Sequence, residues 1–580
     1  MNKPQQSEKQ QNNRTVPELV ADIEALTNEI QELYCLDAIP WVIGYSGGKD
    51  STTVLQLVWN AIAALPLEKR TKAIHVITTD TLVENPIVSA WINNSLKQMK
   101  IAAQEQQMPV EPHLLYPEVK DTFWVCLIGK GYPAPRNRFR WCTERLKITP
   151  ANRFIREMVR ASGEVILVLG MRKAESNKRA SVMAKHAKGR VRDRLNPRAS
   201  LINSLIYTPI EDWRNDEVWI YLNQWPNPWG NSNKDLFTMY RGATADNECP
   251  LVIDTSTPSC GDSRFGCWVC TMVNKDRSME AMIQNDEEKE WMQPLLDIRN
   301  ELDLYDDRER RDFRRIYGKV ELFERNVKGE ISVEPIPGPY TKQWREHWLR
   351  RVLEAQTKIR RSGPEEMSNI TLITEEELSE IRRIWLEEKH EFDDSLPHIY
   401  QQVTGEIFKD SRPGADNRLL GSDEWQVLEE ICGDDAMHLE LMAKLLDTER
   451  QYRTMSRRIG LNEALEKCFN TSSRSKEEAI ENAHFKRDLK HAASEGDVQT
   501  IQLTLKAAAT SISSAVPEEQ GQEEESSAKP LPQTGKKVEG KEKVCKVKGN
   551  DEGLTKQEIT TPEQQTWANR KFPAHSEDTQ

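Results

Sequence analysis

Residues 44–53 read GYSGGKDSTT and lie between two segments of different character. The preceding apolar run, PWVI, is strand-like, and the following text, VLQLVWNAI, is typical of a helix. Gly47 and Gly48 allow the backbone to approach an anion closely. The amides of the first helical turn would point at that anion, with the positive end of the helix dipole behind them. This stretch therefore predicts an anion-binding loop at a strand-to-helix turn.

The side chains of this loop suit a ligand that carries phosphate groups. Lys49 adds positive charge, and Ser46 and Ser51 offer hydroxyl groups. Asp50 at the helix start is a candidate Mg²⁺ ligand, because Mg²⁺ prefers carboxylate oxygens beside phosphates. The spacing differs from the Walker pattern G-x-x-x-x-G-K-[ST]. The alternative interpretation is a glycine-rich turn that holds no ligand.

Strand-like and helix-like text alternates after residue 38. β-rich runs occur at WVIGYS, AIHVITTD, HLLY and VILVLG, and helical stretches such as NPIVSAWINNSLKQMKIAAQ separate them. This alternation predicts an α/β fold, with a parallel sheet and helices on both of its faces. Three of the runs end in polar text, namely SGGKDS, TTD and GMRKAES. Because ligands bind at the carboxyl ends of parallel strands, these three ends predict the site.

The remainder of the chain differs in composition from this α/β segment. Leucines and isoleucines at spacings of four and three predict a helix near the N-terminus, and the text after residue 295 is charged and helix-rich. There Thr374 and Glu377 form a capping box, which marks a helix start. The predicted division is a disordered start over 1–15, an N-terminal helix over 16–37, the α/β domain over 38–295, a mostly α-helical extension over 296–510 and a disordered tail over 511–580.

Overall composition excludes several classes of protein. The chain has 580 residues and a net charge of −12, which argues against a globally basic nucleic-acid binder. No apolar run approaches the ~20 residues of a membrane helix, and the polar start lacks the apolar core of a signal peptide. We therefore expect a cytoplasmic protein with no membrane partner. Disulfides are disfavoured there, so clustered cysteines indicate metal ligands or catalytic thiols.

Five cysteines form a candidate thiolate centre. Cys267 and Cys270 stand in a C-x-x-C, and Cys260 lies seven residues upstream. Cys249 and Cys142 lie further upstream. A C-x-x-C with a third nearby cysteine and a distant fourth suits either zinc or an iron–sulfur cluster.

Positive charge is concentrated in one part of this acidic chain. From Arg172 to Arg198 there are ten Lys or Arg and two acidic residues. Such a run suits the pyrophosphate of a nucleotide or a nucleic-acid backbone, and a solvated surface loop is an equal alternative. His75, within the second strand-like run, is expected to be a core residue with satisfied hydrogen bonds rather than a metal ligand.

The loop resembles the PP-loop, S-G-G-x-D-S, of the ATP pyrophosphatase families, which cleave ATP between the α and β phosphates. In HVITTDTLVENP, Asp80 stands at a position that lies near the adenosine in that family. The text LVLGMRKAESNKRA, with Gly170 and Arg172, resembles the G-x-R-x-x-E-S-x-x-R text of phosphoadenylyl-sulfate reductases. The resemblance implies ATP and Mg²⁺ as cofactors, with Lys49, Asp50 and Arg172 as catalytic residues. It implies a nucleotide site formed by Ser46, Gly47, Gly48, Lys49, Asp50, Ser51, Asp80, Gly170 and Arg172.

The segment RWCTERLKITP resembles the part of adenylyl-sulfate reductases that carries a cysteine pair bound to a [4Fe-4S] cluster. Here Thr143 follows Cys142, so one ligand of that pair is missing. Cys260 is the natural replacement, and Cys249 is the second choice. The resemblance implies a [4Fe-4S] cluster bound by Cys142, Cys260, Cys267 and Cys270, and structural zinc on the C-x-x-C is the alternative.

Over roughly residues 15–500 the chain resembles the DndC family, the PP-loop iron–sulfur proteins of bacterial DNA phosphorothioation. The match rests on GYSGGKDSTTVLQLVW, APRNRFRWCTERLKI, CGDSRFGCWVCTMV and the charged extension. It implies replacement of a non-bridging oxygen of the DNA backbone by sulfur. A cysteine desulfurase and other proteins of the system would be partners. The alternatives are a sulfonucleotide reductase, whose C-terminal E-C-G-x-H segment is absent from this chain, and a non-catalytic scaffold.

Overall fold

A computed structural model gives the structure of most of the chain before residue 496. It describes residues 14–136, 139–175, 180–181, 183, 194–197, 201–243, 266–327, 330–412, 421–453, 455–472 and 475–495. Residues 1–13 of the predicted start and the whole predicted tail lie outside the described residues. The boundaries of the five predicted segments stay predictions.

The sheet has the strand order β3-β2-β1-β4-β6-β5. Its strands are β1 (Trp41–Gly44), β2 (Ile74–Thr79), β3 (Val110–Leu115), β4 (Val165–Val168), β5 (Asn196–Pro197) and β6 (Ser204–Tyr207). The first four and β6 pair in parallel, and only β5, on β6, pairs antiparallel. Trp41 is in register with Ile74 on one side and Ile166 on the other. The predicted α/β fold class is confirmed, whereas the sequence did not indicate β5 and β6.

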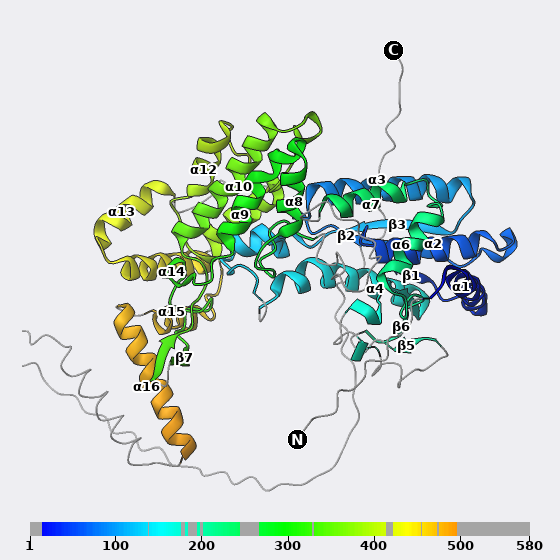
Figure 1. Ribbon diagram of the computed structural model, residues 1–580. Coiled ribbons are helices and arrows are strands. Elements are labelled where there is room, and N and C mark those ends of the chain that lie inside the picture. The colour runs from blue at the N-terminus through cyan, green and yellow to red at the C-terminus, as the bar shows by residue number, and fades with distance from the viewer. Residues whose placement is uncertain are drawn as a thin grey trace, which may run out of the picture. The chain divides into compact units, whose positions relative to one another are not determined.

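Helices cover both faces of this sheet (Figure 1). One face packs against α1 (Val16–Leu36), α2 (Lys49–Ala63), α3 (Pro86–Glu105), α6 (Asn215–Gln224) and α7 (Asn233–Gly242). The opposite face, which includes Val42 and Leu167, packs against α4 (Thr149–Ser162). Residues alternate between the two faces, so Trp41 and Ile43 contact the first group of helices.

The second part of the structure is largely helical, as predicted. Its helices are α8 (Arg277–Asn285), α9 (Gln293–Leu302), α10 (Lys342–Ser362), α11 (Glu375–Arg383), α12 (Ser395–Thr404), α13 (Ser422–Cys432), α14 (Ala436–Arg453), α15 (Leu461–Asn470) and α16 (Lys476–Glu495). The capping box before α11 is confirmed, because the Glu377 amide donates to the Thr374 hydroxyl at 3.2 Å and the Thr374 amide to the Glu377 carboxylate at 2.9 Å. A hairpin that the sequence analysis did not predict, β7 (Leu322–Val327) and β8 (Glu330–Pro335), interrupts the helices.

A second hydrophobic core joins these helices to segments that precede residue 295. The Trp124 indole donates to the Leu372 carbonyl at 2.7 Å, and the Trp385 indole donates to the Ile128 carbonyl at 3.0 Å. Trp268, next to the first cysteine of the C-x-x-C, is buried in the same core. The helical region therefore helps to position the cysteine segments. None of the described helices combines the length and the apolarity needed to span a membrane.

Candidate nucleotide and cysteine site

The loop between β1 and α2 is held in one conformation by internal contacts. Gly47 has φ +71°, and a Cβ there would lie 2.6 Å from Ile92 Cγ1. The Ser46 amide donates to the Ser51 hydroxyl at 3.1 Å, and that hydroxyl donates to the Gly48 carbonyl at 3.0 Å. The Gly47 carbonyl accepts from the Trp91 indole at 3.1 Å. Only glycine fits at position 47, because both the backbone angle and the space exclude a side chain.

The three predicted catalytic residues meet at the start of α2. Arg172 Nε donates to Asp50 Oδ1 at 2.7 Å, and Lys49 Nζ lies 3.2 Å from Asp50 Oδ2. Arg172 follows β4, is 4% exposed and also donates to the Trp213 carbonyl at 3.3 Å. Two cations therefore neutralise the Asp50 carboxylate, and its oxygens and the Ser46 hydroxyl are donors that suit Mg²⁺.

A cavity of about 860 Å³ opens beside this cluster. Its lining includes Ser46, Gly48, Lys49, Asp50 and Arg172, together with the ends of β1 and β2. A volume of this size lies within the range of small-molecule and cofactor sites. The cavity is at the carboxyl ends of the parallel strands, where such folds bind ligands.

Four of the predicted nucleotide-binding residues, Gly47, Ser51, Asp80 and Gly170, do not line this cavity. Asp80 Oδ1 accepts from the Leu82 amide at 2.8 Å and so stabilises a turn in which Leu82 has φ +62°. Burial raises the pKa of the Asp80 carboxyl. A Cβ on Gly170 would lie 2.8 Å from the carbonyl oxygen of Asp50. Asp80 and Gly170 therefore contact backbone groups beside the site, and their contact with a nucleotide stays a prediction.

Replacement of Gly170 by Ala tests this contact. Since the added methyl group meets backbone atoms of Asp50, α2 must shift, and we expect pyrophosphate release from ATP to fall roughly 10–100-fold. Gly242→Ala is the matched control, because the added Cβ meets no heavy atom within 4 Å other than those of its chain neighbours and its own helix backbone. Both variants are assayed with melting temperatures recorded alongside. Equal activity of Gly170→Ala and the control would mean that the close contact between Gly170 and the Asp50 backbone does not position Asp50.

Tyr240, on α7, is a site residue that sequence analysis missed. Its hydroxyl accepts from the Lys49 amide at 3.3 Å, and Lys49 Nζ lies 5.5 Å from its ring centroid. The residue also lines the cavity, and burial raises the pKa of its phenol. No local sequence signal distinguishes it from other helical aromatic residues, because only the fold brings α7 to the loop.

The C-x-x-C is attached to the segment that follows β2. Glu84 and Cys267 form an antiparallel β-bridge, and the Trp268 amide donates to the Val83 carbonyl at 2.9 Å. The Asn85 amide donates to the Gly266 carbonyl at 3.3 Å. These main-chain bonds place the first cysteine beside the segment that follows β2 of the six-stranded sheet.

A buried arginine of the helical region holds the other end of the C-x-x-C loop. Arg299, on α9, is 1% exposed, and its Nε donates to the Cys270 carbonyl at 3.0 Å. Its other nitrogens donate to the carbonyls of Val273 and Asn274, and it forms an ion pair with Asp303 at 2.9 Å. Sequence analysis missed Arg299, since nothing in its local text separates it from the surrounding surface arginines.

Cys142, Cys267 and Cys270 are neighbours in this structure. Cys142 precedes the π-helical segment Thr143–Ile148, which continues into α4, and both Cys142 and Cys267 pack against the second core. Burial raises the pKa of Cys142 and that of Cys267, the latter to about 12, and the negative charge of Cys270 raises both further. Bound metal would be needed to hold these sulfurs together as thiolates.

The three cysteines can be compared with the two kinds of centre that the sequence predicts, a zinc ion and an iron–sulfur cluster. Among the described residues, the three sulfurs do not all lie within 4.8 Å of one another. A tetrahedral zinc ion holds its thiolates about 3.8 Å apart, given Zn–S bonds of about 2.3 Å. An iron–sulfur cluster is wider than one ion and takes cysteine ligands of this kind. Cys249 and Cys260, the candidates for a fourth ligand, lie outside the described residues.

Polar contacts link the cysteines to the cavity. Lys147 Nζ lies 3.0 Å from Glu84 Oε1, and the same oxygen accepts from the Thr81 hydroxyl at 3.1 Å. Cys267 Sγ lies 3.4 Å from the Thr81 hydroxyl and 3.8 Å from Glu84 Oε1. The charges of Cys267 and then Glu84 raise the pKa of Lys147. Because Glu84 and Lys147 line the cavity, one space extends from the phosphate loop to groups that contact Cys267.

The basic residues around Cys142 are partly paired within the protein. Arg136 forms an ion pair with Asp303 at 2.6 Å, and Arg145 pairs with Asp121. Most of the basic run from Arg172 to Arg198 lies outside the described residues, so the three interpretations of it, a nucleotide pyrophosphate site, a nucleic-acid contact and a solvated loop, all stay open.

Sequence comparison gives a family match for the sheet domain. Residues 40–228 match the family described as the phosphoadenosine phosphosulfate reductase domain. The domain has a PP-loop fold. An uncharacterized protein of Methanocaldococcus jannaschii is 28% identical over 186 residues, which are 32% of this chain. The chain spans about a third of the length of that relative, since the match covers 31% of it.

Two solved structures show weaker similarity. Candida glabrata FMN adenylyltransferase, in complex with FAD and inorganic pyrophosphate, is 11% identical with a TM-score of 0.23 over 42% of this chain and 68% of that chain. The U34-tRNA thiolase NcsA of Methanococcus maripaludis, with its [4Fe-4S] cluster, is 14% identical with a TM-score of 0.22 over 39% and 73%. Similarity this low does not bear on activity.

Proposed function

We propose that this protein uses ATP to activate a DNA backbone phosphate, so that sulfur replaces a non-bridging oxygen, as implied by its resemblance to DndC. The observation that carries the proposal is the single cavity lined both by the phosphate loop and by Glu84 and Lys147, which adjoin Cys267. Nucleotide activation and sulfur chemistry need such adjacent groups, because the activated phosphate must meet sulfur before water hydrolyses it.

The first step forms a mixed anhydride. A non-bridging oxygen of the DNA phosphate attacks the α-phosphorus of ATP, a new P–O bond forms, and the bond to the β-phosphate oxygen breaks. Pyrophosphate leaves with the bonding electrons. The loop amides and Lys49 would stabilise the negative charge that develops on the phosphates. Arg172 would keep Asp50 oriented for a Mg²⁺ ion bound with the nucleotide.

The second step replaces oxygen by sulfur. A cysteine desulfurase supplies sulfur as a persulfide, and two thiol groups reduce it to sulfide and become a disulfide. The sulfide attacks the DNA phosphorus. A P–S bond forms, the P–O bond to the adenylate breaks, and AMP leaves with the bonding electrons and the original oxygen. A [4Fe-4S] cluster held by Cys142, Cys267, Cys270 and a fourth ligand would supply a centre for binding sulfur or transferring electrons. Lys147 offers a cation for the departing AMP at the cysteine end of the cavity.

A second candidate is reduction of a sulfonucleotide. The match of residues 40–228 to the phosphoadenosine phosphosulfate reductase domain supports it, whereas the absent E-C-G-x-H segment counts against it. In that reaction a thiol attacks the sulfur of the sulfate group, the nucleotide monophosphate leaves from that sulfur, and ATP is not cleaved. A scaffold role would need neither reaction.

One reconstitution separates these functions. Anaerobically purified protein is incubated with DNA, ATP, Mg²⁺, a cysteine desulfurase with cysteine, and the other proteins of the phosphorothioation system. We expect phosphorothioate-linked dinucleotides after nuclease digestion, in step with AMP and pyrophosphate. Sulfite release from adenylyl sulfate or phosphoadenylyl sulfate with a thiol donor would instead establish the reductase. Unchanged phosphorothioate formation by a Lys49→Ala variant would support the scaffold and refute ATP activation by this chain.

A further inference from the structure

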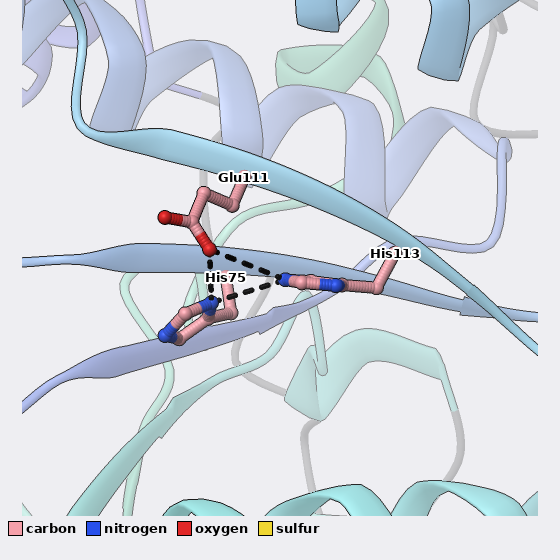
Figure 2. Close-up of side chains that lie close together, drawn as sticks. All are labelled: His75, Glu111 and His113. Carbon is pink, nitrogen blue, oxygen red and sulfur yellow. Dashed lines mark hydrogen bonds and ion pairs between the residues drawn. The ribbon is translucent and has the colours of Figure 1, made fainter. Parts of the chain in front are cut away.

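Two imidazoles and a carboxylate meet at the edge of the sheet, and none of the three residues lines the cavity beside the phosphate loop. His75 lies on β2, and Glu111 and His113 lie on the edge strand β3. In the parallel register His75 pairs with Glu111, and Ile77 pairs with His113. Because residues two apart on a strand share a face, all three side chains project from the same face of the sheet. Figure 2 shows their polar ends converging on one point.

The distances between the three polar atoms match those of a small metal site. His75 Nδ1 lies 3.0 Å from His113 Nε2, and Glu111 Oε2 lies 3.3 Å from the first nitrogen and 3.8 Å from the second. Tetrahedral coordination with bonds of about 2.0–2.1 Å separates ligand atoms by about 3.3–3.4 Å. The observed distances bracket that value, and among the described residues this is the one group of three His, Cys or carboxylate ligand atoms within 4.8 Å.

The surroundings favour neutral imidazoles, which are the form that binds metal. His75 is 8% exposed, and both rings pack against Phe154 of α4, with ring centroids 5.8 and 4.8 Å away. Burial lowers the pKa of each histidine. His75 is buried, as the sequence predicted, but its hydrogen-bond partner is a second imidazole. One proton must be shared between the facing nitrogens, and a metal ion can replace it.

We propose that His75, Glu111 and His113 bind a divalent first-row transition ion, with Zn²⁺ as the best-suited member. Two imidazole nitrogens and one carboxylate oxygen are a common ligand set for Zn²⁺, and Glu111 faces solvent, which leaves a fourth position for water. On binding, the proton between the two facing nitrogens moves to the other nitrogen of its own ring, so both imidazoles bind as neutral ligands. The ion joins β3 to β2 through side chains, so it also stabilises the edge of the sheet. This site is independent of the proposed function.

Zinc uptake by the full chain tests the proposal. Anaerobically purified protein with its cysteine centre intact is stripped with a chelator and titrated with Zn²⁺. We expect the wild type to bind one more zinc ion per chain than His113→Ala, and Glu111→Gln to weaken that binding at least tenfold. Zinc-edge X-ray absorption of the wild type should show nitrogen and oxygen neighbours, which distinguishes this site from zinc on the cysteines.

Both substituted side chains are partly exposed, so the variants are expected to fold, and melting without zinc verifies this. His438→Ala removes an exposed histidine elsewhere and is the matched control, with zinc uptake expected to equal the wild type. Equal zinc stoichiometry and affinity in the wild type and a Glu111→Gln/His113→Ala variant would overturn the proposal. Zinc coordinated only by sulfur in the wild type would also overturn the proposal. His75, Glu111 and His113 would then form only a hydrogen-bonded group.

Discussion

Lys49→Ala and Asp50→Asn are each expected to reduce pyrophosphate release from ATP by roughly 10²–10³-fold. Lys49 is the cation at the phosphate loop, and Asp50 is the carboxylate that Lys49 and Arg172 hold at the mouth of the cavity. The first change removes charge stabilisation of the leaving pyrophosphate, and the second removes a Mg²⁺ ligand. Turnover of α-labelled ATP, with DNA present, measures the loss as labelled AMP.

The Asp50→Asn variant keeps a side-chain oxygen that can accept from Arg172, so it avoids leaving a buried guanidinium without a partner. Lys100→Ala, which removes an exposed lysine from α3, is the matched control for loss of one positive charge and should retain full turnover. Both loop variants should melt within a few degrees of the wild type. If they do so and still turn over ATP at the wild-type rate, the assignment of this loop to ATP fails.

Cys142→Ser and Cys267→Ser are each expected to abolish the broad visible absorption of an iron–sulfur protein and to reduce bound iron to background. Each change removes one thiolate from a centre that needs four, and serine oxygen is a poor ligand for these clusters. The measurements are absorption spectra and iron and sulfide content of protein purified without oxygen. Cys35→Ser is the control, because Cys35 is exposed on α1 and should not affect the iron content.

Zinc would give a different result in the same experiment. A colourless wild-type protein with one zinc ion bound through sulfur would refute the proposed iron–sulfur cluster. It would support the alternative, a structural zinc ion bound by the C-x-x-C. Loss of iron from Cys35→Ser to the same extent as from Cys142→Ser would mean that the decrease reflects unfolding. Since Cys249 and Cys260 lie outside the described residues, the same iron assay on each single variant would identify the fourth ligand.

The fold class was predictable because its signals are local. Each of the runs that form β1, β2 and β4 is apolar and buried, and a helix with its own start signal follows β1 and β2. The strands that were missed lack such signals. β6 has four residues and β5 has two, and the β7–β8 hairpin lies in charged text with little apolar alternation. Short or polar strands depend on their neighbours for stability, so periodicity does not reveal them.

Partner residues of the site could not be predicted in the same way. Tyr240 reaches the phosphate loop from 191 positions away along the chain, and Lys147 meets Glu84 only because α4 packs against the sheet. Arg299 donates to main-chain carbonyls of the C-x-x-C loop. Because every residue has a main-chain carbonyl, such a contact leaves no recognisable pattern in the sequence. Asp80 and Gly170 contact backbone groups beside the candidate site, and their predicted contact with a nucleotide stays a prediction.

The sequence by itself determined the chemistry available to this protein. A glycine loop with lysine and aspartate at a helix start, and a C-x-x-C with further cysteines, are local patterns whose properties follow from the residues themselves. Tertiary structure alone decided which of these groups share a space. In the folded chain the C-x-x-C pairs with the segment that follows β2, and His75 lies beside Glu111 and His113. Arg172 contacts Asp50 in the same way, through the fold. Such contacts depend on strand order and helix packing over the whole domain, which no short stretch of sequence encodes.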